Sequence, residues 1–248
     1  MIKMNINKEF IPSTILINAM AANGVIGDSK ENDIPWRRDA ENRKLYKWDM
    51  EFFKKETEFN PIIMGFKTMQ SLKKPLPNRY NFVVSNLKYG VFPETGIDSQ
   101  YVFPKVFTDY QNDVFSTRDV VDVFTDNNKF IMFDSVEDIL EYIIMKMNAT
   151  FEYEIDKVFF IGGSKLYEEV LKKKYVSNLF ITSLDENYSG NVLFPTEYLK
   201  NYDEYEFLDY NNGDIRKYED KNFMFKENLA MKIGEYQMKK LHDGVNLV

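Results

Sequence analysis

The sequence predicts an α/β protein with a mostly parallel, twisted sheet, flanking helices and an antiparallel C-terminal end. Two patterns support this fold class. Up to the last third of the chain, short apolar runs typical of buried strands, such as Thr14–Ala21 and Lys157–Ile161, alternate with amphipathic helices. In the last third, apolar and polar residues alternate in Tyr205–Tyr210, Phe223–Lys226 and Glu235–Leu241, and this pattern indicates antiparallel strands.

Composition narrows the possible classes of protein. The chain has 248 residues, of which 44% are hydrophobic and 16% aromatic, so it can fill a large core. Its net charge of −7 argues against non-specific nucleic-acid binding. The absence of cysteine excludes disulfides and thiol chemistry and suits a reducing cytosol, while the single histidine, His242, argues against histidine metal clusters. No apolar run approaches about 18 residues, so we expect no membrane span.

The same periodicities predict the remaining elements. Further buried strands are expected at Ile62–Met64, Tyr80–Ser85, Lys129–Phe133 and Val176–Ser183. Helices are expected at Lys47–Phe59, Gly65–Leu72, Ser135–Met147 and Ser164–Lys174. The last of these should bury Leu166, Tyr167, Val170 and Leu171.

We expect one domain spanning residues 1–248. It carries a long, irregular insertion at about 88–128, with strand-like pieces such as Gln100–Phe107, and an extended C-terminal hairpin region at about 204–241. Arg37–Tyr46 is highly charged and has no apolar face, so it is expected to form a solvated loop or a frayed helix.

The helix at Lys47–Phe59 carries the most informative polar residue. Asp49 is expected in its first turn, with Phe52 and Phe53 three and four residues further on and therefore on the same face. A carboxylate beside apolar side chains is unfavourable without a partner, which favours a functional role. The alternative is a structural Asp stabilised by the helix N-terminus, although no capping box is present.

Three loops are candidates for ligand contact. Gly162-Gly163 separates a buried strand from a helix, and Gly65 does the same after Ile62–Met64; such turns can bind phosphate, but many bind nothing. The loop from Ala22 to Trp36 is either a surface loop anchored by its tryptophan or a mobile loop that closes over a ligand.

Taken together, these stretches resemble dihydrofolate reductase. The matching pieces occur in the family's order and cover most of Thr14–Pro195. They are ILINAMAANGVIG, IPW, WDMEFFKKET, PIIMGFKTMQSL, PLPNR, FVVSN, KVFFIGGSKLYEEVL, LFITSLDEN and GNVLFP. The resemblance implies NADPH-dependent reduction of 7,8-dihydrofolate to tetrahydrofolate, for one-carbon and thymidylate metabolism. Hydride would move to pterin C6, with protonation at N5.

The resemblance also implies which residues form the site. The catalytic group would be Asp49, Trp36, Tyr167 and Thr182. Substrate would be bound by Ile17, Asp49, Met50, Phe53, Lys54, Leu72, Lys74, Leu76, Arg79 and Thr182. Here Asp49 anchors the pterin, Thr182 is its partner, and Arg79 pairs with the α-carboxylate of the glutamate tail. No metal is implied.

The cofactor implied by the resemblance is NADPH. Its nicotinamide side would contact Ala19, Ile26 and Gly27. Its phosphates and adenosine would contact Gly65, Lys67, Thr68, Ser85, Asn86, Gly162, Gly163, Ser164, Lys165, Leu166 and Tyr167. Tyr167 would also lie close to the nicotinamide, and Ile161 would be a further cofactor contact. The implied partners are dihydrofolate and antifolate inhibitors, and we expect a cytoplasmic monomer that binds neither nucleic acid nor membrane.

Several positions depart from the family pattern. Phe66 replaces the usual arginine after the glycine, which puts one contact to the 2′-phosphate in doubt. Asn18 replaces a small apolar residue, and Arg37–Tyr46 is additional between Trp36 and Asp49. Asn211–Gly234 is also longer than the family needs.

Two other functions are compatible with parts of this pattern. A pyrimidine reductase of riboflavin synthesis would share the NADPH turn, but WDMEFF and PLPNR count against it. A non-catalytic nucleotide-binding protein on the same scaffold would be distinguished by its failure to turn over dihydrofolate. A fused thymidylate synthase is excluded within this chain because no cysteine nucleophile is present.

Overall fold

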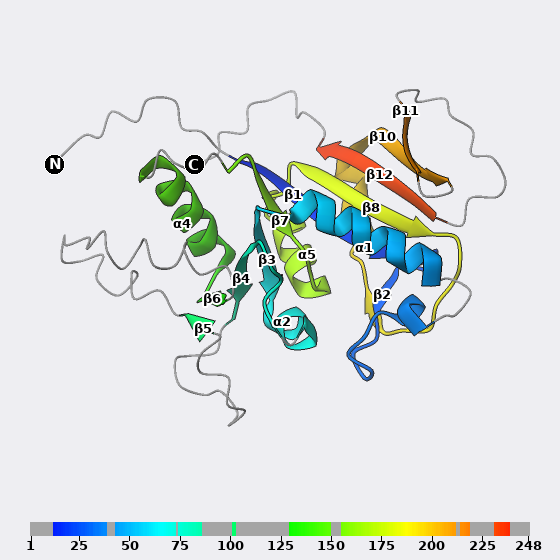
Figure 1. Ribbon diagram of the computed structural model, residues 1–248, viewed down its shortest axis with the longest axis horizontal. Helices are drawn as coiled ribbons and strands as arrows, with labels where there is room; N and C mark the ends of the chain where they lie inside the picture. Colours follow the sequence, from blue (N-terminus) through cyan, green and yellow to red (C-terminus); the bar gives the residue numbers. More distant parts are fainter. Residues whose placement is uncertain are drawn as a thin grey trace. The chain divides into compact units, whose positions relative to one another are not determined.

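The computed structural model describes residues 12–38, 43–72, 74–85, 101–102, 129–149, 155–211, 214–218 and 231–238. The chain divides into two compact units, whose helices and strands are labelled in Figure 1. Unit 1 contains Met1–Ser13 and Thr57–Phe159, and unit 2 contains Thr14–Glu56 and Phe160–Val248. In the described part of the chain, no helix is long and apolar enough to cross a membrane.

Unit 1 is built on parallel strands. Its elements are β3 (Pro61–Gly65), α2 (Phe66–Leu72), β4 (Tyr80–Val84), β5 (Tyr101–Val102), β6 (Phe130–Phe133), α4 (Val136–Ala149) and β7 (Lys157–Phe160). The strand order is β7-β3-β4-β6-β5, and the β3–β4, β4–β6 and β5–β6 pairs are parallel. Buried apolar side chains fill β3, β4 and β6, as expected for strands covered on both faces.

Unit 2 combines a parallel strand pair with an antiparallel end. Its elements are β1 (Ser13–Met20), β2 (Val25–Gly27), η1 (Pro35–Arg38), α1 (Arg43–Thr57), α5 (Ser164–Lys172), β8 (Asn178–Leu184), β9 (Val192–Leu193), η3 (Thr196–Asn201), β10 (Tyr202–Asn211), β11 (Asp214–Tyr218) and β12 (Met231–Met238). The order is β11-β10-β12-β8-β1, in which only β1–β8 is parallel. Strands β2 and β9 form a separate small sheet.

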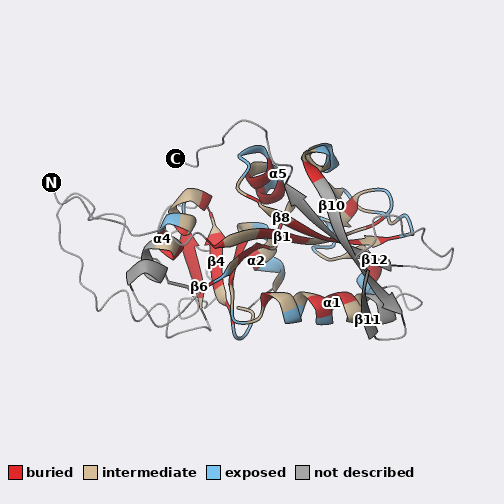
Figure 2. Ribbon diagram, turned by 90° about the horizontal axis from the view of Figure 1, so that it is seen from above, coloured by how far each residue is buried: buried red, intermediate tan, exposed pale blue. Residues whose placement is uncertain are grey.

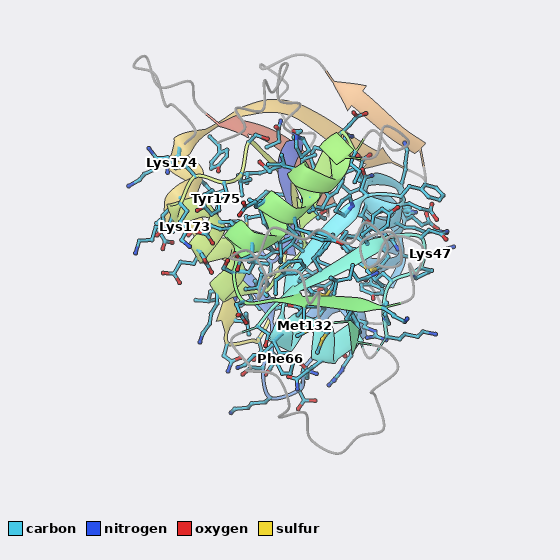
Figure 3. All side chains as sticks on the ribbon, turned by 90° about the vertical axis from the view of Figure 1, so that its left-hand side faces the viewer. Lys47, Phe66, Met132, Lys173, Lys174 and Tyr175 are labelled. Atoms are coloured by element: carbon cyan, nitrogen blue, oxygen red, sulfur yellow. The ribbon has the colours of Figure 1, made fainter. Side chains whose placement is uncertain are left out.

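Helix α1 lies along β1 and β8 and is amphipathic (Figures 1 and 2). Its inner side contains Phe52, whose ring packs edge-on against Phe180 of β8 at a centroid distance of 5.8 Å. Its outer side is charged: Lys47 is exposed (Figure 3) and forms an i,i+4 ion pair with Glu51 at 3.7 Å. Burial of one stripe of side chains therefore orients the helix on the sheet.

The predicted fold class is confirmed, and most elements lie within a few residues of their predicted positions. The helix α4 begins as predicted, since the Ser135 hydroxyl accepts a hydrogen bond from the Asp138 N–H at 3.1 Å. The inner face of α5 is also as predicted, because Leu166, Tyr167, Val170 and Leu171 are all buried.

The predicted start of α1 is wrong. The helix begins at Arg43 rather than Lys47, so Asp49 lies beyond the first turn and is not a helix-start residue. Arg37–Tyr46 was expected to form a solvated loop or a frayed helix. Arg37 and Arg38 lie in η1, and Arg43–Tyr46 opens α1, so the helical alternative applies to its second half. The first turn of α1 could not be recognised from the sequence, because its residues show no apolar periodicity.

The C-terminal strands differ in detail from the prediction. The expected strands near Tyr205–Tyr210 and Glu235–Leu241 correspond to β10 and β12. The structure also has β11 at Asp214–Tyr218, which was not predicted. Phe223–Lys226 lies outside the described residues, as does most of the 88–128 insertion; Gln100–Phe107 is described only at Tyr101–Val102.

Candidate active site

Asp49 is a buried carboxylate on the inner side of α1, with 7% of its surface exposed. Burial raises the pKa of Asp49 to about 6, and a hydrogen bond from Thr182 acts in the opposite direction. Because Asp49 lies beyond the first turn of α1, the helix N-terminus does not explain its presence. A buried carboxylate with one hydroxyl partner keeps further acceptor positions for a ligand.

The sheet places Thr182 opposite Asp49. In the parallel β1–β8 pair, Ile17 is aligned with Phe180 and Ala19 with Thr182. Aligned residues of neighbouring strands point to the same face, so these side chains lie on the side of the sheet covered by α1. The fold thus brings together predicted site residues from three separate stretches of the sequence.

Tyr167 approaches the same strand from α5. Its hydroxyl donates a hydrogen bond to the Ile17 carbonyl at 2.9 Å, and the residue is buried. Burial raises the pKa of Tyr167 strongly, and the charge of Asp49 adds to this effect. Tyr167 is therefore a neutral hydroxyl within electrostatic range of Asp49.

The loop after β1 is held by the segment after β8. The Asn23 side chain donates to the Tyr188 carbonyl at 2.9 Å. The Ser29 N–H donates to the Asn191 side chain, also at 2.9 Å, and the Asn191 amide donates back to the Ser29 hydroxyl. Trp36 is 1% exposed and packs edge-on against Tyr188 at 5.6 Å. This arrangement favours the interpretation of Trp36 as an anchor of the loop.

Gly190 allows the closest approach in this region. A Cβ atom at Gly190 would lie 2.6 Å from both the Gly27 carbonyl oxygen and the Val25 Cγ1 atom. No side chain fits at that distance, so only glycine allows β2 and this segment to meet. Gly190, Tyr188 and Asn191 were not identified from the sequence, because their partners are remote in the chain.

The glycine turn before α5 has the features of a phosphate site. Gly162 has φ = 115°, a conformation that side-chain-bearing residues rarely adopt. Gly163 is the N-cap of α5 and makes no side-chain cap hydrogen bond, so the helix presents uncapped backbone N–H groups. The Ser164 hydroxyl donates to the Leu193 carbonyl at 2.6 Å, which connects this turn to β9. The donor set fits a pyrophosphate.

The other predicted residues of unit 2 lie on these same elements. Met50 and Phe53 are half-buried on α1, Ile26 and Gly27 are half-buried on β2, and Ile161 is half-buried after β7. Lys54 and Lys165 are exposed, and Leu166 is buried in α5.

Unit 1 contains a buried arginine. Arg79 is only 3% exposed; its Nε donates to the Thr57 hydroxyl at 2.8 Å and its Nη1 donates to the Pro77 carbonyl at 2.9 Å. Burial lowers the pKa of Arg79, and the nearby Glu58 charge opposes this shift. The guanidinium is thus held in one orientation. Thr57 and Glu58 were not identified from the sequence.

The remaining predicted residues of unit 1 are less constrained. Leu72 and Leu76 are half-buried, and Lys74 and Lys67 are exposed. Gly65 ends β3 and Thr68 lies in α2, while Ser85 is buried just after β4, where its N–H donates to the Phe133 carbonyl at 2.9 Å. Asn86 lies outside the described residues.

Asn18, where the resemblance implies a small apolar residue, has an unusual side-chain environment. Its amide nitrogen is buried and has no hydrogen-bond partner among the described residues. Its aligned partner in β8 is Ile181, so its side chain points away from the face that carries Ile17 and Ala19. Asn18 therefore lies beside the site in sequence but on the opposite face of the sheet.

Comparison with known proteins places these features in a family. A family model described as dihydrofolate reductase matches residues 13–101 and 103–227. A dihydrofolate reductase of Bacillus subtilis (strain 168) is 28% identical over 216 residues, covering 81% of this chain and 95% of that protein. A dihydrofolate reductase of Buchnera aphidicola subsp. Acyrthosiphon pisum (strain APS) is 28% identical over 219 residues, covering 88% and 96%.

A solved structure shows the same fold. The dihydrofolate reductase from Enterococcus faecalis, complexed with NADP(H) and RAB-propyl, is similar with a TM-score of 0.56 and 19% identity. The similarity covers 92% of this chain and 98% of that one. The two matched segments include α1 with Asp49, the turn at Gly162-Gly163 and β8 with Thr182, and the chain belongs to the dihydrofolate reductase family.

Proposed function

We propose that this protein reduces 7,8-dihydrofolate to 5,6,7,8-tetrahydrofolate with NADPH. The observation that supports it most directly is the buried Asp49 carboxylate, hydrogen-bonded to Thr182, in a chain of the dihydrofolate reductase family. The product would supply one-carbon and thymidylate metabolism.

In this proposal Asp49 binds and orients the pterin. Its carboxylate accepts two hydrogen bonds, from the 2-amino group and N3, and this bidentate arrangement fixes the ring. The low-polarity surroundings that raise the pKa of Asp49 also strengthen these hydrogen bonds. The negative charge favours protonation of the substrate at N5 through water. Thr182 holds the carboxylate, and Ile17, Met50 and Phe53 form apolar walls.

Unit 2 also supplies contacts for NADPH, which when bound provides the hydride that is transferred to pterin C6. We propose that the uncapped N–H groups at the start of α5 hold the pyrophosphate, with Gly162 and Gly163 allowing close approach. Ala19, Ile26 and Gly27 would contact the nicotinamide side. Tyr167 would position strand β1 through its hydrogen bond to Ile17. The task of the chain is to orient two rings and exclude water.

Unit 1 supplies the other proposed contacts. Arg79, held by Thr57 and Pro77, would pair with the α-carboxylate of the glutamate tail. Leu72, Leu76 and Lys74 would contact the substrate, and Lys54 of unit 2 is assigned to the same tail. Gly65, Lys67, Thr68 and Ser85 would contact the adenosine and phosphate part of the cofactor, as would Asn86.

The decisive experiment is Asp49→Asn, assayed with dihydrofolate and NADPH by the loss of NADPH absorbance. The amide keeps the shape but removes the charge, and we expect kcat at neutral pH to fall by about 10²-fold or more. Asp185→Asn is the matched control, because Asp185 is an exposed carboxylate at the end of β8 and its loss should leave kcat unchanged. Activity of Asp49→Asn within a few-fold of wild type would show that the assignment is wrong.

We further propose that the protein is a cytoplasmic monomer, that residues 1–248 unfold as one domain, and that antifolates compete with dihydrofolate. Size-exclusion chromatography tests whether the protein is a monomer. Urea unfolding followed by two probes tests the single domain, and inhibition kinetics test competition by antifolates. A dimer, two separate unfolding transitions or non-competitive inhibition would contradict them in turn.

A further inference from the structure

We propose that Asn81 is a positioning residue for substrate binding: its buried side-chain amide holds Leu76 and Arg79 in place. The inference deepens the proposed function, because it rests on the assignment of those two residues to the substrate. Asn81 itself has no place among the residues assigned to substrate or cofactor.

Three hydrogen bonds connect Asn81 to the loop before it. The Asn81 Oδ1 atom accepts from the Leu76 N–H at 2.9 Å. Its Nδ2 atom donates to the Leu76 carbonyl at 3.0 Å and to the Arg79 carbonyl at 2.9 Å. The residue is fully buried on β4, with 0% of its surface exposed. A single side chain therefore binds the backbone at both ends of the segment from Leu76 to Arg79.

The loop needs such a partner because its own backbone has few ways to pair. Pro75 and Pro77 lack an N–H group, and Asn78 has φ = 58°, so a regular ladder cannot form through this segment. Asparagine is the residue that offers one acceptor and two donors at this length. Aspartate would lack both donors, and serine would reach fewer of the three groups.

Arg79 depends on this loop for its orientation. Its Nη1 donates to the Pro77 carbonyl, which lies between the two residues that Asn81 binds, and its Nε donates to the Thr57 hydroxyl. Removing the Asn81 amide takes away the acceptor of the Leu76 N–H and a donor to the Leu76 and Arg79 carbonyls, so the loop loses the contacts that fix its position. A small displacement of a carboxylate-binding arginine weakens binding strongly, because bidentate pairing is sensitive to geometry.

The expected signature is a split between KM and kcat. Asn81→Ala and Asn81→Ser should raise the KM for dihydrofolate about tenfold while kcat stays within about threefold, since Asp49 is untouched. The KM for 6-methyl-7,8-dihydropterin, which lacks the aminobenzoyl-glutamate tail, should change by less than about twofold. Arg79→Ala is the reference variant, with an expected rise of about thirtyfold or more for dihydrofolate alone.

Val83→Ala is the matched control. Val83 lies on the same strand and is equally buried, so its truncation removes packing without removing a loop hydrogen bond. Even if Val83→Ala destabilises the protein as much as Asn81→Ala does, it should leave unchanged the ratio of the KM for dihydrofolate to the KM for 6-methyl-7,8-dihydropterin. A change in that ratio as large as that of Asn81→Ala would mean that the effect is merely structural.

Other outcomes distinguish a failure of the Asn81 role from a failure of the Arg79 assignment. If Arg79→Ala alters the KM ratio and the Asn81 variants do not, the positioning role of Asn81 is wrong. If Arg79→Ala also leaves the ratio unchanged, the Arg79 assignment and this inference both fail, while reduction of dihydrofolate by the wild type still stands. If neither Asn81 variant folds, amide exchange of Leu76 in the wild-type protein decides: about 100-fold protection is expected, and exchange at the unprotected rate overturns the proposal.

Discussion

The Thr182 hydroxyl donates a hydrogen bond to the buried Asp49 carboxylate. This contact joins α1 to β8, and it only partly offsets the unfavourable burial of the charge, because the pKa of Asp49 remains raised to about 6. The ionised form of this carboxylate is therefore less favourable than that of an exposed aspartate. A ligand that offers two donors would stabilise that form, so the cost of burying Asp49 is a source of ligand affinity.

Stability should depend on pH through Asp49. The folded-state pKa is about 6, and the unfolded value is about 3.9, so the folded state binds more protons between these values. The free energy of unfolding should therefore fall as pH rises from about 4 to about 6. At about 1.4 kcal/mol for each pH unit between the two pKa values, the loss is on the order of 2 to 3 kcal/mol. Urea unfolding of wild type and Asp49→Asn across this range measures it. A stability difference between the two proteins that is constant with pH would contradict the prediction.

Cofactor preference should depend on two exposed lysines. Phe66, at the start of α2 (Figure 3), stands where the resemblance implies an arginine, and Lys67 and Lys165 are the candidate replacements. We expect NADPH to be preferred over NADH, and we expect each Lys→Ala variant to reduce the ratio of kcat/KM values about tenfold. Added salt should reduce the ratio in the wild type as well. Lys172→Ala, which removes another exposed lysine of α5, is the control. An unchanged ratio in the Lys67→Ala/Lys165→Ala double variant would exclude both as readers of the 2′-phosphate.

Gly190→Ala should loosen the pairing of β2 with β9. The added methyl group would overlap the Gly27 carbonyl and the Val25 side chain, and overpacking of this kind typically costs about 1 to 3 kcal/mol of unfolding free energy. We also expect a higher KM for NADPH, because Ile26 and Gly27 are the proposed nicotinamide contacts on β2. Ser189→Ala, at the exposed neighbouring position, should change neither quantity. If Gly190→Ala matched Ser189→Ala in both measurements, the close approach would not constrain this loop.

Asn18→Ala should stabilise the protein. The Asn18 amide nitrogen is buried without a hydrogen-bond partner among the described residues, and removing such a group relieves a desolvation cost of about 1 to 3 kcal/mol, less the packing that is lost. We expect a net gain of about 1 kcal/mol in urea unfolding. Asn23→Ala provides the contrast, because it removes an amide that donates to the Tyr188 carbonyl and should be neutral or destabilising. A loss of stability on Asn18→Ala would mean that the amide has a partner.

Local sequence patterns were sufficient for most of the fold and for the identity of the family. The buried face of α5, the N-cap Ser135 and the glycine turn at Gly162 all follow from residues within a few positions of one another. Helical and strand periodicities are local properties, so they can be read directly. The pattern failed at the start of α1, where the sequence from Arg43 to Tyr46 shows no apolar periodicity.

The pairings that make the site were decided by tertiary structure. Thr182 meets Asp49 because β1 and β8 align in one register with α1 above them, and Arg79 is held by Thr57 because two separate segments meet. The roles of Asn81 and Gly190 likewise depend on backbone groups brought close by folding. The amino-acid sequence alone determined which residue types were available and on which elements they lie. Burial and distance, which set the pKa of Asp49 and the orientation of Arg79, arise only when remote segments pack and exclude water.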